Sequence, residues 1–445
     1  MFFQRLLRQD ARGQIVKQYK NPRPKDWASI CMRPVFERAS LEDTISKIFE
    51  DVRINGDKAL KSLTKKYDGI DLANVMLSKE EISELASTTP PDLKMAILTA
   101  YKNILSFHRL QVPLNLKPYE TSRGVVCWQE NKAIEKVGLY IPGGSAPLIS
   151  TVLMLGIPAR LAGCSEVILC TPPSADGLVN PAICLAAQLV GVSKIIRVGG
   201  VQAIAGLTFG TESVPAVNKV FGPGNQYVSA AKEYARRYGV GLDLPAGPSE
   251  IMVIADETAI PAFVAADLLS QAEHGPDSQV VLVASKTEVI DKVQREILKQ
   301  LKDLPRREIV IKALENSFCV LFKDVKTAMD FANTYAPEHL ILSVANPEKI
   351  AGQVINAGSV FLGNFTPESA GDYASGTNHT LPTGGWTKAY GSLGVDDFLK
   401  KISFQNISKD GLEGLASIIT TIAEAEGLGA HARAVIKRLN FKENI

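Results

Sequence analysis

Histidine is scarce in this chain of 445 residues, and four of the five histidines lie beside other side chains that bind metals or transfer protons. They are His274 in LSQAEHGPDS, His339 in YAPEHL, His379 in ESAGDYASGTNHTLP and His431 in AEGLGAHARA. Their companions are carboxylates and amides, namely Gln271 and Glu273, Glu338, Asp372, and Glu426. Imidazole nitrogens and carboxylate oxygens serve both as metal ligands and as general acids or bases. The pattern predicts one metal or proton-transfer site, with chance clustering as the alternative.

Two of these motifs suggest metal ligands. The apolar periodicity of residues 261–274 predicts a helix, on which Gln271 and His274 share a face near the C-terminal end. Such a pair could form half of a zinc site, whereas a helix-capping histidine with an exposed glutamine is the alternative. Asp372 adds an oxygen ligand from a Gly- and Ser-rich stretch, which we expect to be a loop after a strand over 359–363. A polar surface turn would have the same composition.

The Glu338-His339 dipeptide could supply a base and a proton relay. It precedes an apolar run over 340–344 that predicts a buried strand. Histidine titrates near neutral pH, and burial raises the pKa of a glutamate toward the same range. An exposed Glu-His pair would look the same in the sequence. The fifth histidine, His108, lies in an amphipathic helical stretch and is expected to be a packed or exposed bystander.

Three glycine-rich segments suggest a phosphate-bearing cofactor. They are IPGGS (141–145), VGGVQAIAG (198–206) and FGPGNQY (221–227), and each follows a predicted strand. Glycine lets the backbone approach a pyrophosphate closely, and the N-terminus of a helix attracts anions. None of the three segments has the G-x-G-x-x-G pattern, so tight turns without a cofactor are the alternative.

The composition indicates a soluble protein and disfavours a nucleic-acid or membrane partner. Lys plus Arg number 49 and Asp plus Glu 47, which gives a net charge of +2 and no general excess of basic side chains. The six cysteines lack C-x-x-C spacing and are expected to be reduced thiols. Arg5, Arg8 and Asp10 interrupt the start of the chain, so we expect no signal peptide and a cytoplasmic location.

The periodicity of apolar residues changes along the chain. Residues 1–40 are polar and contain three prolines, so we expect an arm, and residues 41–110 are helical with a turn at Asn55-Gly56. Short apolar runs then alternate with helical stretches, which predicts mostly parallel sheets. The expected strands form two series: 137–141, 167–170, 194–198 and 219–221, then 251–255, 280–284, 319–322, 340–344 and 359–363. Two series predict two α/β domains, followed by a helical appendage.

Several long motifs resemble the histidinol dehydrogenase family. They are GLYIPGGSAPLISTVLMLGIPA, GPGN, PAGPSEIMVIAD, LLSQAEHGPDSQV, YAPEHL and PESAGDYASGTNHTLPT, in the order of the family, and the similarity runs from about residue 30 to the C-terminus. The resemblance implies oxidation of L-histidinol to L-histidine with zinc and two NAD+. The intermediate aldehyde would stay bound, and the reaction would complete histidine biosynthesis. The resemblance also implies a homodimer whose metal site is shared between the subunits.

The resemblance assigns roles to individual residues. The implied zinc ligands are Gln271, His274, Asp372 and the partner subunit's His431. Glu338 and His339 would be the base and the relay. The implied substrate contacts are Ser249, His379, Glu426 and His339 together with the four zinc ligands, with Tyr373 nearby. The implied NAD+ contacts are Tyr140, Gln202 and Asn225.

The implied architecture is α/β, with two Rossmann-like domains whose sheets are mostly parallel, a small N-terminal arm and a small helical C-terminal domain. Residues 1–37 would form the arm. Residues 38–138 and 249–393 would form a discontinuous domain that carries the metal and catalytic residues. Residues 139–248 would bind NAD+, and residues 394–445 would mediate dimerisation.

The residues and the resemblance agree on a chemical scheme. Zinc would orient the substrate through its imidazole and amine, while His339 takes the alcohol proton and Glu338 activates water to attack the aldehyde. No cysteine lies in these motifs, so a thiohemiacetal route has no candidate nucleophile. Two other functions stay open. One is a zinc hydrolase, which would leave the glycine-rich segments unexplained, and the other is a nucleotide-binding regulatory protein with a structural metal.

Overall fold

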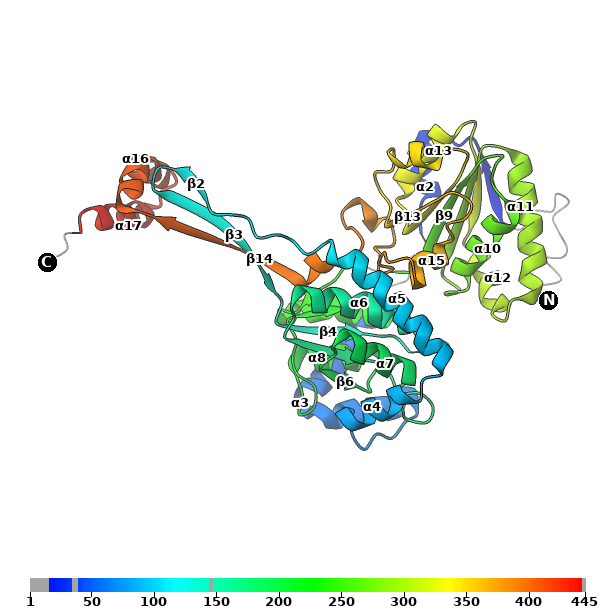
Figure 1. Ribbon diagram of the computed structural model, residues 1–445, viewed down its shortest axis with the longest axis horizontal. Helices are drawn as coiled ribbons and strands as arrows, with labels where there is room; N and C mark the ends of the chain where they lie inside the picture. Colours follow the sequence, from blue (N-terminus) through cyan, green and yellow to red (C-terminus); the bar gives the residue numbers. More distant parts are fainter. Residues whose placement is uncertain (1–15, 34–38, 144–146, 246, 442–445) are drawn as a thin grey trace.

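The computed structural model describes residues 16–33, 39–143, 147–245 and 247–441. Three sheets organise them: a five-stranded and a six-stranded sheet, each parallel throughout, and a three-stranded antiparallel sheet. Figure 1 shows two bodies built on the parallel sheets and a long projection that carries the C-terminal helices away from them. The α/β architecture expected from the sequence is confirmed, and among the described residues no helix is long and apolar enough to cross a membrane.

The five-stranded sheet has the strand order β6-β5-β4-β7-β8 and lies between two layers of helices. Successive side chains of β5 point to opposite faces of the sheet. Val167 and Leu169 join the apolar core on one face, while Ile168 and Cys170 join the core on the other. The strands are β4 (Lys136–Tyr140), β5 (Glu166–Cys170), β6 (Lys194–Ile196), β7 (Lys219–Phe221) and β8 (Gly241–Leu242). The helices between them are α6 (Ile149–Ala162), α7 (Pro181–Val190), α8 (Gly200–Phe209) and α9 (Gln226–Ala235).

The helices before the first of these strands pack on the same sheet. They are α3 (Ala39–Asp68), α4 (Lys79–Ser87) and α5 (Pro91–Arg109), and α3 bends at Gly56, where the sequence predicts a turn. Phe49 and Leu60 of α3 share a core with Ile204 of α8. This packing differs from the expected grouping of residues 38–138 with 249–393. An amphipathic pattern shows that one helix face is buried but does not show against which sheet.

The six-stranded sheet has the order β1-β11-β10-β9-β12-β13. Its strands are β1 (Lys17–Lys20), β9 (Glu250–Ala255), β10 (Gln279–Ala284), β11 (Phe318–Leu321), β12 (His339–Ser343) and β13 (Ser359–Leu362). One face packs against α10 (Pro261–Ala272), α11 (Thr287–Gln300) and α12 (Arg307–Glu315). The other packs against α2 (Pro24–Ile30), α13 (Val325–Tyr335) and α14 (Pro347–Ala351). The described part of the expected N-terminal arm therefore belongs to this body as edge strand β1 and helix α2.

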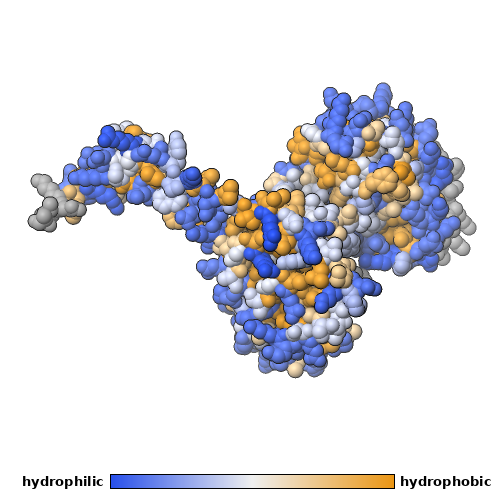
Figure 2. Space-filling model, in the orientation of Figure 1, coloured by the Kyte–Doolittle hydropathy of each residue, from blue (hydrophilic) through white to orange (hydrophobic). Residues whose placement is uncertain are grey.

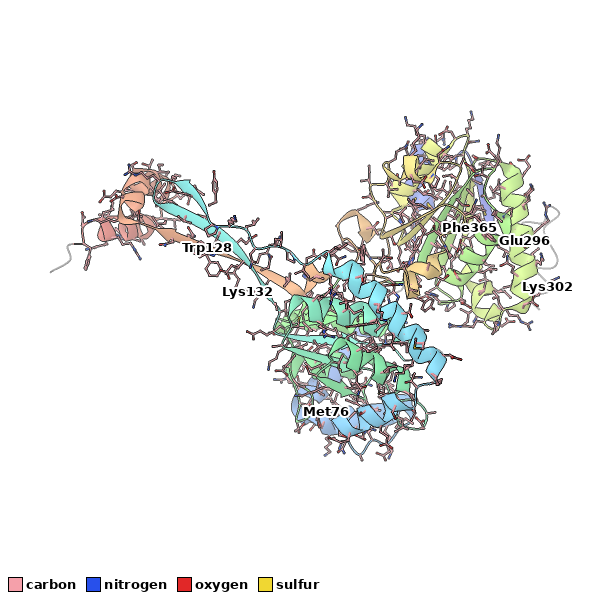
Figure 3. The ribbon with its side chains drawn as sticks, viewed as in Figure 1. Met76, Trp128, Lys132, Glu296, Lys302 and Phe365 are labelled. Atoms are coloured by element: carbon pink, nitrogen blue, oxygen red, sulfur yellow. The ribbon has the colours of Figure 1, made fainter. Side chains whose placement is uncertain are left out.

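The third sheet forms the projection. It pairs β14 (Leu399–Ile407) with β3 (Val125–Ala133) and β3 with β2 (Tyr119–Ser122), and it leads to α16 (Lys409–Ala425) and α17 (Gly429–Leu439). Trp128 of β3 stacks on Phe404 of β14 at a centroid distance of 5.2 Å, and Figure 3 shows Trp128 and Lys132 along this ribbon. The expected C-terminal helices are present. The three strands of this sheet were not predicted from the sequence, and the polar residues of β14 alternate only weakly.

Candidate metal and catalytic site

The predicted histidine cluster lies at the amino-terminal edge of the six-stranded sheet. Glu338 and His339 stand at the start of β12, and Ser249 directly precedes β9. Helix α10 returns to this edge, so that Gln271 and His274 lie at its C-terminal end. Asp372 comes from a short helix, α15 (Glu368–Tyr373), which corrects the expectation of a loop. The glycines and serines that suggested a loop mostly follow this helix.

His339 is the centre of the cluster. Its ring is buried, and Nδ1 lies 3.1 Å from the carbonyl oxygen of Glu250. Nε2 lies 3.8 Å from Asp372 Oδ1 and 3.9 Å from Glu368 Oε1, and it has no hydrogen-bond partner among the described residues. Burial alone would lower the pKa of His339, but the negative charges of Glu338, Asp372 and Glu368 outweigh burial and raise it to about 10. Nε2 of this ring therefore faces the carboxyl groups of Asp372 and Glu368 without a hydrogen bond to either.

Glu338 is a buried carboxyl group in the same cluster. Its Oε2 accepts a hydrogen bond of 2.7 Å from the backbone N–H of Glu250 and lies 3.6 Å from His339 Nδ1. Burial is the main reason why the pKa of Glu338 rises to about 8. A carboxyl group with this pKa can exchange a proton near neutral pH, as a general base must.

Three side chains could hold a metal ion together. The ligand atoms of His274, Glu368 and Asp372 lie within 4.8 Å of one another. Burial raises the pKa of Asp372, but the neighbouring imidazole rings of His339 and His379 hold it well below its ordinary value. Burial and the charge of Asp372 raise the pKa of Glu368 to about 8. The set therefore combines an ionised carboxylate, a second carboxyl group and an imidazole, which are donors that suit zinc.

Gln271 completes the oxygen donors at this point. With its Nε2 toward Glu368, the fully buried amide donates to Glu368 Oε1 at 3.0 Å and its oxygen accepts from Glu250 N–H at 3.2 Å. In the opposite orientation its oxygen faces a carboxylate oxygen, an arrangement that a cation between them would stabilise. The buried amide and the unpaired His339 Nε2 thus fit a metal site with Gln271, His274 and Asp372 as ligands.

The structure brings most of the remaining predicted residues to the same place. Ser249 Oγ lies 3.4 Å from His274 Nδ1. His379 contacts the backbone oxygen of Asp372 through Nδ1 at 2.9 Å and Thr151 Oγ1 of α6 through Nε2 at 3.2 Å. Since α6 covers the five-stranded sheet, His379 links the two bodies. Tyr373 follows Asp372 and is exposed.

Glu426 and His431 are the two predicted residues that lie elsewhere. Glu426 ends α16 and His431 is in α17, both at the far end of the projection (Figure 1). Within one chain these side chains are remote from Asp372 and His274. Their assignment to the site depends on a second subunit.

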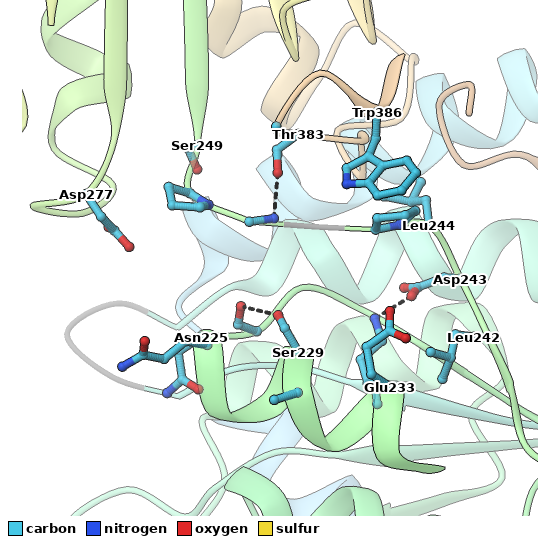
Figure 4. Close-up of a pocket in the computed structure, with 18 of the residues that line it drawn as sticks. Asn225, Ser229, Glu233, Leu242, Asp243, Leu244, Ser249, Asp277, Thr383 and Trp386 are labelled. Carbon is cyan, nitrogen blue, oxygen red and sulfur yellow. Dashed lines mark hydrogen bonds and ion pairs between the residues drawn. The ribbon is translucent and has the colours of Figure 1, made fainter. Parts of the chain in front are cut away.

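A cleft of about 1070 Å³ is lined by Ser249 and His274 on one side and by residues of the five-stranded body on the other. In Figure 4, Asn225 and Ser229 of α9 face Ser249, Asp277 and Thr383 across this cleft. Asn225 caps α9 by accepting hydrogen bonds from the N–H groups of the next turn at 3.0 and 3.1 Å. The cleft therefore lies against a capped helix N-terminus at the carboxyl edge of the five-stranded sheet.

The other two predicted cofactor residues lie at that same carboxyl edge. Tyr140 ends β4, and its hydroxyl accepts a hydrogen bond of 3.0 Å from the N–H of Gly200. Gln202 is buried in the first turn of α8. All three glycine-rich segments follow strands at this edge, as expected, although residues 144–146 of the first lie outside the described residues.

Several residues that hold the site were not predicted from the sequence. Glu368 precedes Asp372 by four positions, a helical spacing that could have shown it. Glu250 directly follows Ser249 in the motif PAGPSE. His108 was expected to be either packed or exposed, and it is packed. Its Nδ1 lies 2.8 Å from the carbonyl oxygen of Ile104, and its Nε2 lies 3.2 Å from Asn378 Nδ2. It thereby supports the segment that carries His379.

Comparisons with known proteins agree on one family. A sequence model described as histidinol dehydrogenase matches residues 31–439. The chain is 52% identical over 426 residues to the histidinol dehydrogenase of Bacteroides thetaiotaomicron, covering 96% of this chain and 99% of the relative. It is 48% identical to that of Vibrio parahaemolyticus over 414 residues, covering 92% and 95%.

A solved structure extends this agreement to the fold. The crystal structure of histidinol dehydrogenase from Elizabethkingia anophelis superposes with a TM-score of 0.92 at 48% identity, covering 96% of this chain and 98% of that one. The full-length match in sequence and in structure leads to one conclusion. The chain belongs to the histidinol dehydrogenase family.

Proposed function

We propose that this protein oxidises L-histidinol to L-histidine, with zinc and two NAD+, through an aldehyde that stays bound. The observation that carries the proposal is the clustering of Glu338 and His339 with the possible metal ligands His274, Glu368 and Asp372. Of these, His274 lines a cleft whose opposite side includes Asn225 of the third glycine-rich segment. Membership of the histidinol dehydrogenase family supports the substrate.

Gln271, His274 and Asp372 would hold the zinc ion, together with the partner subunit's His431. Zinc would supply a positive charge that orients the imidazole and amine of the substrate and polarises its oxygen. His379 and Ser249 border this position and are suited to hydrogen bonding with the substrate. Glu368 is placed to orient the amide of Gln271.

His339 is suited to remove the alcohol proton. Because Nδ1 faces the carbonyl oxygen of Glu250, that nitrogen carries a hydrogen, and Nε2 faces Asp372 and Glu368. A metal cation held there would offset the carboxylate charges and favour the neutral ring, whose Nε2 could then accept a proton. The surrounding carboxylates stabilise the imidazolium that forms. Uptake of the proton at Nε2 would leave the carbinol carbon free to lose hydride.

Glu338 is suited to activate the water that converts the aldehyde to the acid. Its carboxyl group is buried and its pKa of about 8 makes the ionised form a strong base for a carboxylate. The N–H of Glu250 fixes one carboxylate oxygen and leaves the other available to water. The hydrated aldehyde would then lose a second hydride.

NAD+ would bind against the five-stranded body and accept hydride at each step. Asn225 lines the cleft, while Tyr140 and Gln202 are buried at the same carboxyl edge of the sheet. The N-terminus of α9 would attract the negatively charged pyrophosphate. This mode of binding uses the carboxyl edge of a parallel sheet without the usual fingerprint sequence.

A homodimer would explain the projection. Its helices expose Ile418, Ile422 and Ile436 at 54%, 55% and 42%. Apolar residues also gather over α5 and α6 in Figure 2, and the segment after α5 exposes Leu110 and Leu114 at 85% and 90%. Exposed apolar surface of this kind favours a partner, and a second copy would carry Glu426 and His431 to the site. We propose a cytoplasmic location for this dimer.

The test is nicotinamide reduction by the purified protein with L-histidinol and NAD+, before and after chelation. We expect NADH formation to disappear with the bound metal and to return when zinc is added. A folded, zinc-loaded protein that forms no NADH would contradict the proposal and would redirect attention to metal-dependent hydrolysis.

A further inference from the structure

An N-terminal arginine reaches the interior of the six-stranded body. Arg33 donates through Nε and Nη2 to the two carboxylate oxygens of Glu250, each at 3.0 Å. Its guanidinium lies 3.6 Å from the centroid of the Tyr335 ring, and Nη2 also donates to the Tyr335 carbonyl oxygen at 2.8 Å. The side chains of Arg33 and Glu250 are 17% and 2% exposed. The ion pair is therefore bidentate and largely buried, and its guanidinium stacks on the Tyr335 ring.

Glu250 is also the residue whose main chain holds both reacting side chains. Its N–H donates to Glu338 Oε2 at 2.7 Å, and its carbonyl oxygen lies 3.1 Å from His339 Nδ1. Its Oε1 accepts a third hydrogen bond, from the N–H of Gly384 at 2.9 Å. A change in the backbone conformation of Glu250 would displace both its N–H and its carbonyl oxygen. Glu338 and His339 would then lose their positions at the same time.

We propose that Arg33 and Glu250 form a positioning pair that fixes the base and the relay. This inference rests on the proposed function for the roles of Glu338 and His339. A buried ion pair often adds little stability compared with apolar residues, because both charges must lose their water. What a bidentate arginine does supply is a fixed orientation. Here that orientation is transmitted through one residue, Glu250, to the two groups that move protons.

The test is a double-mutant cycle in the full-length, zinc-loaded protein. The variants are Arg33→Met, Arg33→Lys, Glu338→Gln and Arg33→Met combined with Glu338→Gln, each measured for oxidation of added histidinal with NAD+. Zinc content and melting temperature report on the metal site and the fold independently of turnover. Lys65→Met, which breaks an exposed ion pair with Asp71, is the matched control.

We expect Arg33→Met to lower kcat by about 10- to 100-fold while KM for histidinal changes less than about twofold. Arg33→Lys should recover part of the loss, because lysine keeps the charge but not the paired contacts. In the Glu338→Gln background, Arg33→Met should lower the residual rate by less than about threefold, because the base that it positions is already absent. Zinc content should stay at the wild-type level.

The proposal fails if the two losses multiply, or if Arg33→Met lowers kcat only in proportion to the folded fraction. If Arg33→Met does not fold, Arg33→Lys and Glu250→Gln complete the same cycle. A wild-type protein that does not oxidise histidinal would overturn the proposed function itself. An active wild type whose Arg33 variants keep full kcat would overturn the positioning pair alone.

Discussion

The two parallel sheets face the cleft with opposite edges and with different chemistry. The five-stranded body presents its carboxyl edge, where glycine-rich turns and helix N-termini offer backbone N–H groups. The six-stranded body presents its amino edge, where carboxylates and imidazoles of β12, α10 and α15 crowd together. The difference supports the proposal that one body binds the anionic cofactor while the other holds the metal and transfers protons.

Each body also contains a buried ion pair that holds its own half of the cleft. Arg33 and Glu250 support Glu338 and His339. In the five-stranded body, Lys232 pairs with Asp243 and donates to the carbonyl oxygen of Gly222 at 2.9 Å, while Asp243 accepts from the N–H of Gly222 at 2.7 Å. Gly222 has a φ of +120°, and a Cβ there would lie 2.1 Å from the carbonyl oxygen of Tyr140. The pair therefore fixes a turn that only glycine can form.

The largest effect should come from Glu338→Gln. Loss of the base should slow the water-dependent second oxidation by about 10²- to 10⁴-fold and the first oxidation much less. Single-turnover experiments should then show histidinal that persists. Equal losses of rate in both oxidations would show that Glu338 does not act specifically in the second oxidation.

The next effect concerns the assignment of Glu426 and His431 to a second subunit. His431→Ala and His274→Ala should each be inactive, but after subunit exchange one site in each mixed dimer is intact. Random mixing should restore about a quarter of the wild-type sites. Activity that stays absent in verified mixed dimers would contradict a shared metal site.

A smaller effect should distinguish the cofactor half of the cleft from the catalytic half. Lys232→Met leaves the buried Asp243 charge without its partner and should loosen the turn at Gly222. We expect KM for NAD+ to rise by about tenfold while zinc content and KM for histidinol stay near wild type. Lys65→Met again serves as the control. A selective loss of zinc would contradict the placement of Lys232 in the cofactor half of the cleft.

The smallest effect concerns a carboxyl group behind the metal-binding residues. Burial raises the pKa of Asp267 on α10 to about 6, so its folded-state pKa lies above the ordinary value. The protonated Asp267 therefore contributes fully to the free energy of unfolding at pH values below the pKa it has in the unfolded chain. This contribution is lost as the pH rises through 6. Asp267→Asn should raise the melting temperature by a few degrees, about 2–4 °C, at pH 8 and leave it nearly unchanged at pH 4. An identical shift at both pH values would exclude titration of Asp267 as the cause.

The residues proposed as catalytic could be singled out from the sequence because they lie in short motifs. Glu338 adjoins His339, and Gln271 is one helical turn from His274, so local spacing already places each pair together. Arg33 and Glu250 are 217 positions apart, and no local pattern joins them. The same limit applies to β14 and β3, whose pairing joins distant segments of weak alternation. The other strands of the two parallel sheets coincide with predicted apolar runs, since buried parallel strands are short and continuously apolar, whereas the edge strands β1 and β8 were not predicted.

The edge at which the site lies could not be predicted either. Chemistry in α/β folds is usually expected at the carboxyl ends of strands. Here Glu338 and His339 precede their strand, and α10 and α15 bring Gln271 and Asp372 back to the same edge. Only the packing of the two bodies shows that the amino edge of one sheet meets the carboxyl edge of the other.

The most direct test of the proposal that one cleft joins proton transfer to two hydride transfers is the stoichiometry of the reaction. Wild-type protein would be given limiting L-histidinol and excess NAD+, and NADH and the imidazole product would be quantified together. We predict two NADH for each histidinol, with histidine as the product and no free aldehyde. One NADH with released histidinal would contradict the account, because the half of the site built around Glu338 would then have no part in the reaction.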